Sequence, residues 1–130
     1  MRIRTAAAAL GIALAGVAFA TTAGAGSASA ITPIIDPSNG VYLAVLFDQG
    51  DTAALNNSPI PGVLEQLAPD GRTTMLIDPA SSLPRDDHTV YATVPAVVAE
   101  AAGRHGEFGF GWYDPNVNAG NPVRVIQVLP

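Results

Sequence analysis

The residues of this chain that could do acid–base or nucleophilic chemistry are few and gather around one histidine. His88 directly follows Asp86 and Asp87, and Ser81 and Ser82 stand a few positions earlier. These are the residue types of a Ser-His-Asp hydrolase, in which the histidine takes the serine proton and the carboxylate orients the histidine. Neither serine lies in a Gly-x-Ser-x-Gly turn, the constrained setting that usually holds a nucleophilic serine. We therefore predict no catalytic residue and keep a small hydrolase using His88 as an alternative.

Metal binding has one candidate segment. Asp114, Asn116 and Asn118 place oxygen ligands at the first, third and fifth positions of a calcium-loop pattern. The pattern then fails, because Ala119 stands where a sharp turn needs glycine and Val125 stands where a bidentate glutamate should close the shell. The chain has no cysteine, which excludes disulfides, thiol catalysis and cysteine zinc sites. The sequence predicts neither a metal nor a cofactor.

A binding role has better support than catalysis, because polar residues follow an aromatic strand. Tyr113 stands next to Asp114, with Asn116 and Asn118 in the loop that follows. Rings beside amides are common in recognition loops. We predict that these four residues form a contact patch for a partner protein or a cell-wall glycan. The structural alternative is that Tyr113 is only a surface ring covering the hairpin.

A third interpretation is a protease inhibitor that presents the loop 78–87. Pro79 and Pro84 would stiffen this loop, and Leu83 or Arg85 would be its specificity residue. Preorganised loops make tight inhibitors, so the idea is physically coherent. No disulfide holds the loop rigid, and we keep inhibition as an alternative to a non-catalytic binding module.

The first thirty residues predict export. Arg2 and Arg4 form a basic start, residues 6–20 form an apolar run, and Ala-Ser-Ala at 28–30 supplies a small-residue cleavage signal. The apolar run is shorter than the roughly 20 residues that span a bilayer. We therefore predict a signal peptide of bacterial type and a secreted, extracellular domain of residues 31–130, with no membrane attachment after cleavage.

The charge balance of the predicted mature domain excludes two classes of partner. Without Arg2 and Arg4, four arginines and no lysine remain against eleven acidic residues, which gives a net charge of −7. Nucleic acids and anionic membranes are bound mainly through Lys and Arg. We predict that neither is a partner.

A domain of this size can bury roughly two-thirds of its unfolded surface and needs no disulfide.

The strand at 107–113 is expected to be the centre of the core. Successive side chains in a strand point to opposite faces, so Phe108, Phe110 and Trp112 share one side. Gly109 and Gly111 leave the other side almost bare. We expect the three rings to be buried. The glycine strip is expected either to receive the helix predicted at 94–102 or to be a site of strong local twist.

One helix and two further strands accompany it. Apolar residues at helical spacing predict a helix at 94–102, with Thr93 as its N-cap and Gly103 as its stop. Residues 41–47 are apolar on both faces and predict an interior strand, and residues 123–129 predict a strand that pairs with the aromatic strand as an antiparallel hairpin.

The structure of the remaining segments is predicted from turn residues and from the alternation of apolar and polar residues. Residues 49–61 predict a loop, and the Pro-Asp-Gly turn at 69–71 favours a hairpin between 63–68 and 72–77 over a helix at 63–68. Alternation at 88–94 predicts a one-sided strand. Together these elements predict the α+β class: a single small β-rich domain with an antiparallel sheet and one short helix. The alternative is an all-β sandwich.

Overall fold

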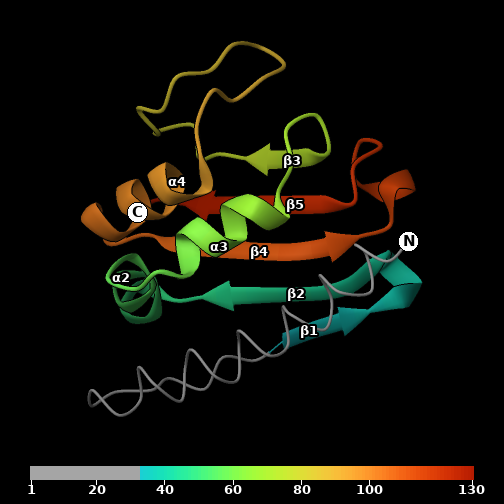
Figure 1. The fold of residues 1–130 in the computed structure, drawn as a ribbon, viewed down its shortest axis with the longest axis horizontal. Helices are drawn as coiled ribbons and strands as arrows, with labels where there is room; N and C mark the ends of the chain where they lie inside the picture. The colour runs from blue at the N-terminus through green and yellow to red at the C-terminus, as the bar shows by residue number, and fades with distance from the viewer. Residues whose placement is uncertain (1–32) are drawn as a thin grey trace.

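The computed structural model describes residues 33–130 (Figure 1). The predicted signal peptide and its cleavage site lie outside the described residues. The strands are β1 (Pro33–Asp36), β2 (Val41–Phe47), β3 (Thr73–Leu76), β4 (Glu107–Tyr113) and β5 (Val123–Val128). The helices are α2 (Gln49–Asn56), α3 (Ile60–Leu67) and α4 (Val94–Gly103), with short 3-10 turns η1 (Pro37–Asn39) and η2 (Pro115–Val117).

The five strands form one open sheet in the order β1-β2-β4-β5-β3. The pairs β1·β2, β2·β4 and β4·β5 are antiparallel, whereas β3 and β5 are parallel. The α+β class and the β4·β5 hairpin are therefore confirmed. The predictions of a purely antiparallel sheet and of a single helix are wrong, and the all-β sandwich is excluded by the three helices packed on one open sheet.

The ring-bearing face of β4 is the core, as predicted. Phe108, Phe110 and Trp112 are 1%, 4% and 6% exposed, and the last two rings meet edge to face at 5.3 Å. They cluster with residues of all three helices, and Figure 1 shows α3 and α4 in front of the sheet. The expectation that a helix lies on the glycine strip is wrong, because the large rings supply the apolar surface that a helix must cover.

The glycines instead allow close packing of β4 against its neighbours in the sheet. A Cβ at Gly111 would lie 2.7 Å from the carbonyl oxygen of Leu43 and 2.8 Å from the Cα of Ala44. Backbone atoms of a paired strand cannot move aside independently. Gly111 is therefore required by close packing within the sheet.

Helix α4 confirms the predicted helix. The Thr93 side chain accepts a hydrogen bond from the N–H of Ala96 at 3.2 Å, as an N-cap does. The helix includes Gly103 and is capped by Arg104, one residue later than predicted. His105, next along the chain, has a positive φ of 57°.

Residues 49–61, predicted as a loop, contain α2 and the start of α3. The Asp48 side chain caps α2 by accepting the N–H of Asp51 at 2.9 Å, and Thr52 Oγ donates to the carbonyl of Phe47 at 3.1 Å. Pro61 lies in the first turn of α3, where a missing N–H costs nothing. The polar residues of 49–61 that suggested a loop thus lie within and between two short helices.

Two other strand predictions are wrong. Residues 63–68 lie in α3 and its C-cap, so the predicted hairpin with 72–77 does not form, although β3 itself is confirmed. Residues 88–93 form no strand apart from one isolated bridge between Arg85 and Val90, and Val94 begins α4. None of the helices among residues 33–130 is long and apolar enough to cross a membrane.

We predict that Gly111→Ala lowers the free energy of unfolding by about 2 kcal/mol, because the added methyl group meets the backbone of β2. Gly103→Ala is the matched control: its Cβ meets nothing within 4 Å, and alanine favours the helix. Urea unfolding followed by Trp112 fluorescence measures both. Equal stability of the two variants would contradict the close packing at Gly111.

Candidate functional site

A groove runs along the outer side of β3, between this strand and residues 85–93. Its volume is about 1020 Å³, at the upper end of the range of roughly 300–1,000 Å³ typical of ligand pockets. Figure 1 shows the connection from β3 to α4 arching outside β3. The groove is lined by Glu65, Ala68, Asp70, Gly71, residues 73–77, residues 85–93, Ala119 and Asn121.

Strand β3 has a free edge toward this groove. Its partner in the sheet is β5, and it ends the strand order. In a strand, alternate residues direct their N–H and C=O groups to opposite sides, so half of the β3 backbone groups point away from β5. Within the described residues, no backbone hydrogen bond connects β3 to residues 85–93. The groove therefore offers unpaired strand backbone.

The position of β3 is held by the loop between β4 and β5. Thr74 Oγ donates to the carbonyl of Asn118 at 3.0 Å and accepts from the side-chain amide of Asn121 at 3.0 Å. These bonds tie the edge strand to the loop as well as to β5. Strand β3, which lines the groove, is thus held both by β5 and by the loop between β4 and β5.

Asp86 shapes the opposite wall. Its carboxylate accepts the N–H groups of His88 and Thr89, each at 2.8 Å, and the hydroxyl of Tyr91 at 2.6 Å. The Tyr91 hydrogen bond is the main reason that the pKa of Asp86 lies below its ordinary value, followed by the two backbone bonds. Asp86 organises the turn that replaces the predicted strand at 88–94.

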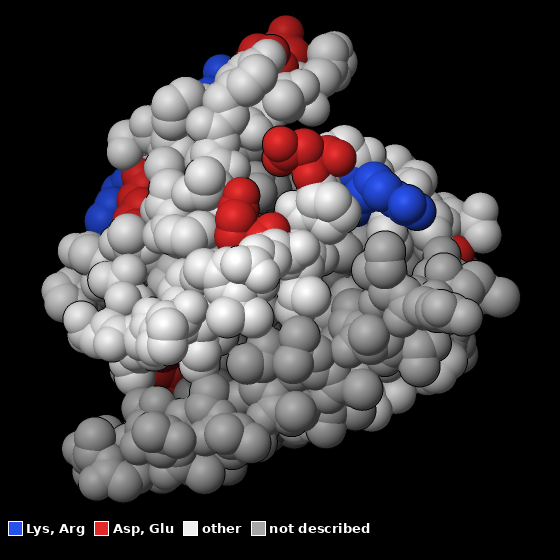
Figure 2. All heavy atoms as spheres, in the orientation of Figure 1, with Lys and Arg blue, Asp and Glu red and all other residues white. Residues whose placement is uncertain are grey.

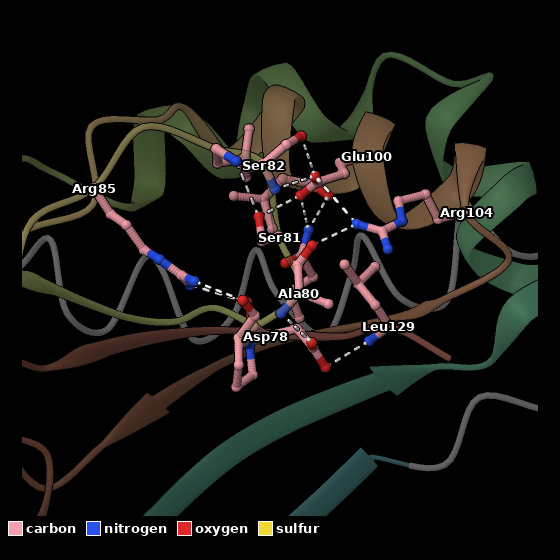
Figure 3. Close-up of polar contacts among 12 residues, drawn as sticks. Asp78, Ala80, Ser81, Ser82, Arg85, Glu100, Arg104 and Leu129 are labelled. Atoms are coloured by element: carbon pink, nitrogen blue, oxygen red, sulfur yellow. Dashed lines mark hydrogen bonds and ion pairs between the residues drawn. The ribbon is translucent and has the colours of Figure 1, made fainter.

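Glu100 on α4 anchors the start of this connection (Figure 3). Its carboxylate accepts the hydroxyls of Ser81 and Ser82 at 2.5 and 2.6 Å, the N–H of Ser82 at 2.7 Å and the amide of Gln127 at 2.8 Å. Arg104 lies 3.8 Å away. The Glu100 side chain is only 10% exposed. One partly buried carboxylate therefore joins the loop, α4 and β5.

Further hydrogen bonds fix both ends of the connection. Asp78 accepts the N–H of Leu129 at 3.0 Å, and Arg85 donates to the carbonyls of Asp78 and Pro79 at 2.9 and 2.8 Å (Figure 3). At the other end, Glu65 on α3 accepts the first N–H of α4 at 2.6 Å. The wall is held in place by side chains rather than by strand pairing.

The hydrogen bonds at Glu100 decide its protonation. Burial raises the pKa of its carboxyl group, but the bonds from Ser81, Ser82 and Gln127 outweigh burial and bring the pKa to about 2, from an ordinary value of 4.5. A carboxylate this weakly basic is a poor general base at neutral pH. The contact between Ser81 and Glu100 therefore serves structure rather than nucleophilic catalysis.

The predicted contact patch is distributed between surface and interior. Tyr113 is 7% exposed, with the Arg124 guanidinium 4.2 Å from its ring centre, so the prediction of a surface ring is wrong. Both Trp112 and Tyr113 are buried because residues on both faces of β4 are covered. Asp114 is half-buried, and Asn116 is exposed.

The polar atoms of the same loop bind one another. Asn118 is 1% exposed; its amide donates to the carbonyls of Asn121 and Val123 at 2.7 and 2.9 Å and accepts from Arg124 at 2.7 Å. Asp114 accepts from the backbone and the side chain of Asn116. A binding role for these residues stays a prediction, whereas Ala119 and Asn121 of this loop line the groove. No group of three acidic or histidine side chains among residues 33–130 forms a metal site.

The geometry gives no separate support to the two alternatives. Ser81 and Ser82 donate to Glu100, whereas His88 lies in the groove wall. Leu83 packs against the core, and Arg85 binds carbonyls of its own loop. Ser81, Ser82, Leu83 and Arg85 are thus engaged in holding the connection, whereas the exposed side chain of His88 is not.

Sequence reasoning missed the groove and Glu100. The partners of Glu100 lie 18 to 27 positions away in the chain, so no local motif connects them. The one available signal is an acidic residue inside an otherwise apolar helix. No family model, curated protein or solved structure matches this chain.

We predict that Glu100→Gln lowers the free energy of unfolding by about 2 kcal/mol at neutral pH, because an amide cannot accept all of these hydrogen bonds. The carboxylate pKa is lower in the folded state, so its stabilisation is complete above pH 4.5 and is lost as the pH falls toward about 2. The difference between wild type and variant should shrink over that range.

Urea unfolding at several pH values measures this difference, with Glu107→Gln, an exposed carboxyl on β4, as the control. A difference that is absent at neutral pH, or that persists unchanged near pH 2, would contradict the role assigned to the Glu100 carboxylate.

Proposed function

We propose that this protein is a secreted, non-catalytic binding module that takes up an extended peptide in the groove beside β3. The observation that supports the proposal is the free edge of β3 facing a groove of about 1020 Å³. An extended peptide can add a strand to such an edge, with main-chain hydrogen bonds giving affinity and side-chain contacts giving specificity.

The two edges of the sheet differ in a way that supports this assignment. Strand β1 begins with Pro33, and its pairing with β2 is irregular between Ile34 and Asp36. Proline and bulges are common protections of an edge strand. Strand β3, with the sequence Thr-Thr-Met-Leu, has neither proline nor charge. Of the two edges, β3 is the one suited to accept a strand.

The lining favours a peptide over a glycan. Sugar sites commonly use aromatic rings as stacking platforms, and the groove has one such ring, Tyr91. The Tyr91 hydroxyl is already bonded to Asp86. A row of unpaired backbone groups along β3 instead matches the repeat of another strand.

We predict that a pool of short capped peptides, in which valine alternates with lysine, threonine or glutamate, shifts the backbone amide signals of residues 73–77 and 85–93 in NMR spectra. The fully N-methylated pool should produce no shifts, because it cannot donate main-chain hydrogen bonds to β3. The two pools carry the same side chains, which makes the comparison specific for strand pairing.

Other outcomes would contradict the proposal. Shifts confined to Tyr113, Asp114, Asn116 and Asn118 would assign binding to the predicted contact patch. Shifts produced only by cell-wall glycan fragments would make the protein a glycan binder. Shifts that survive N-methylation, or none at all, would exclude strand addition at β3.

A further inference from the structure

We infer that the peptide bound beside β3 is basic: an extended segment that carries Lys or Arg. This inference rests on the proposed function and specifies its ligand. The lining of the groove contains Glu65, Asp70, Asp86 and Asp87 against a single arginine, Arg85. Acidic residues lie on both sides of the groove. Glu65 and Asp70 belong to α3 and to the turn before β3, and Asp86 and Asp87 belong to the connection opposite β3. Figure 2 shows acidic atoms on this face and on the projecting loop, with basic atoms beside some of them.

The one arginine does not neutralise these carboxylates. The Arg85 guanidinium donates to the carbonyls of Asp78 and Pro79, within its own loop. Among residues 33–130, the ion pair within 4 Å joins Arg104 to Glu100, outside the groove lining. The groove therefore keeps an excess of negative charge.

Two of the carboxylates are available to a ligand. Asp86 and Glu65 accept hydrogen bonds that hold the wall and α4. Asp70 and Asp87 are exposed, and their side chains make no hydrogen bond or ion pair with the described residues. These two carboxylates can therefore pair with an ammonium or guanidinium group in the groove.

The same charge argues against a second copy of this chain as the occupant. Residues 31–130 contain no lysine and carry a net charge of −7. Two such domains repel each other, and an acidic groove adds to the repulsion. The occupant is thus a different, basic chain, drawn to a groove whose walls concentrate the negative potential.

The experiment titrates the three peptides separately against the purified protein. The valine–lysine peptide should bind about tenfold more tightly than the valine–threonine peptide, the combined effect of two or three surface ion pairs. The valine–glutamate peptide should bind more weakly than both. At about 1 M salt, where the Debye length is about 3 Å, the preference should disappear.

The double variant Asp70→Asn, Asp87→Asn should lose the preference for lysine while its affinity for the valine–threonine peptide stays unchanged. Glu107→Gln, which removes a carboxyl group outside the groove lining, is the control and should keep the preference. Unfolding curves check that both variants are folded.

The outcomes separate this inference from the proposed function. Equal binding of the lysine and threonine peptides, with shifts at β3, would overturn the basic ligand and leave strand addition intact. A lysine preference that survives in the double variant would overturn the roles of Asp70 and Asp87. Binding of none of the peptides would overturn both proposals.

Discussion

The fold depends on the asymmetry of β4, which carries three rings on one face and glycines on the other. The rings of Phe108, Phe110 and Trp112 require cover, and all three helices contribute to the cluster around them. Gly109 and Gly111 allow close approach of β2 and β5. Because α4 must reach the ring face after β3, the chain passes outside β3 in the long connection that becomes the groove wall.

A long connection without regular structure needs other means to hold its shape. Glu100 supplies one by accepting hydrogen bonds from Ser81, Ser82 and Gln127, which costs less than burying an unpaired charge. The arrangement leaves one buried acceptor, Gln127 Oε, without a partner among the described residues. The Gln127 amide is thus oriented by the hydrogen bond from its nitrogen to the Glu100 carboxylate, while its oxygen stays without a bond.

Local patterns predicted the elements whose signals are local. The limits of β2 and the N-cap of α4 follow from apolar runs and from Thr93. The error at 49–61 arose because polar residues and prolines also occur at the ends of short helices. The error at 63–77 arose because the Pro-Asp-Gly turn at 69–71 follows a helix instead of joining two strands. The parallel pairing of β3 with β5, the edge position of β3 and the contacts of Glu100 join residues distant in the chain, so no local pattern reports them.

A free strand edge is a liability, because any exposed strand can pair with it. Here the usual protections, a lysine or proline in the strand, are absent from β3, and the charge lies instead in the surrounding groove. Carboxylates placed around an edge oppose pairing with another copy of this acidic chain without blocking the backbone groups of β3. They do not oppose a basic strand. The charges that oppose self-association would therefore also select the proposed basic partner, so protection of the edge and the proposed specificity have one physical origin.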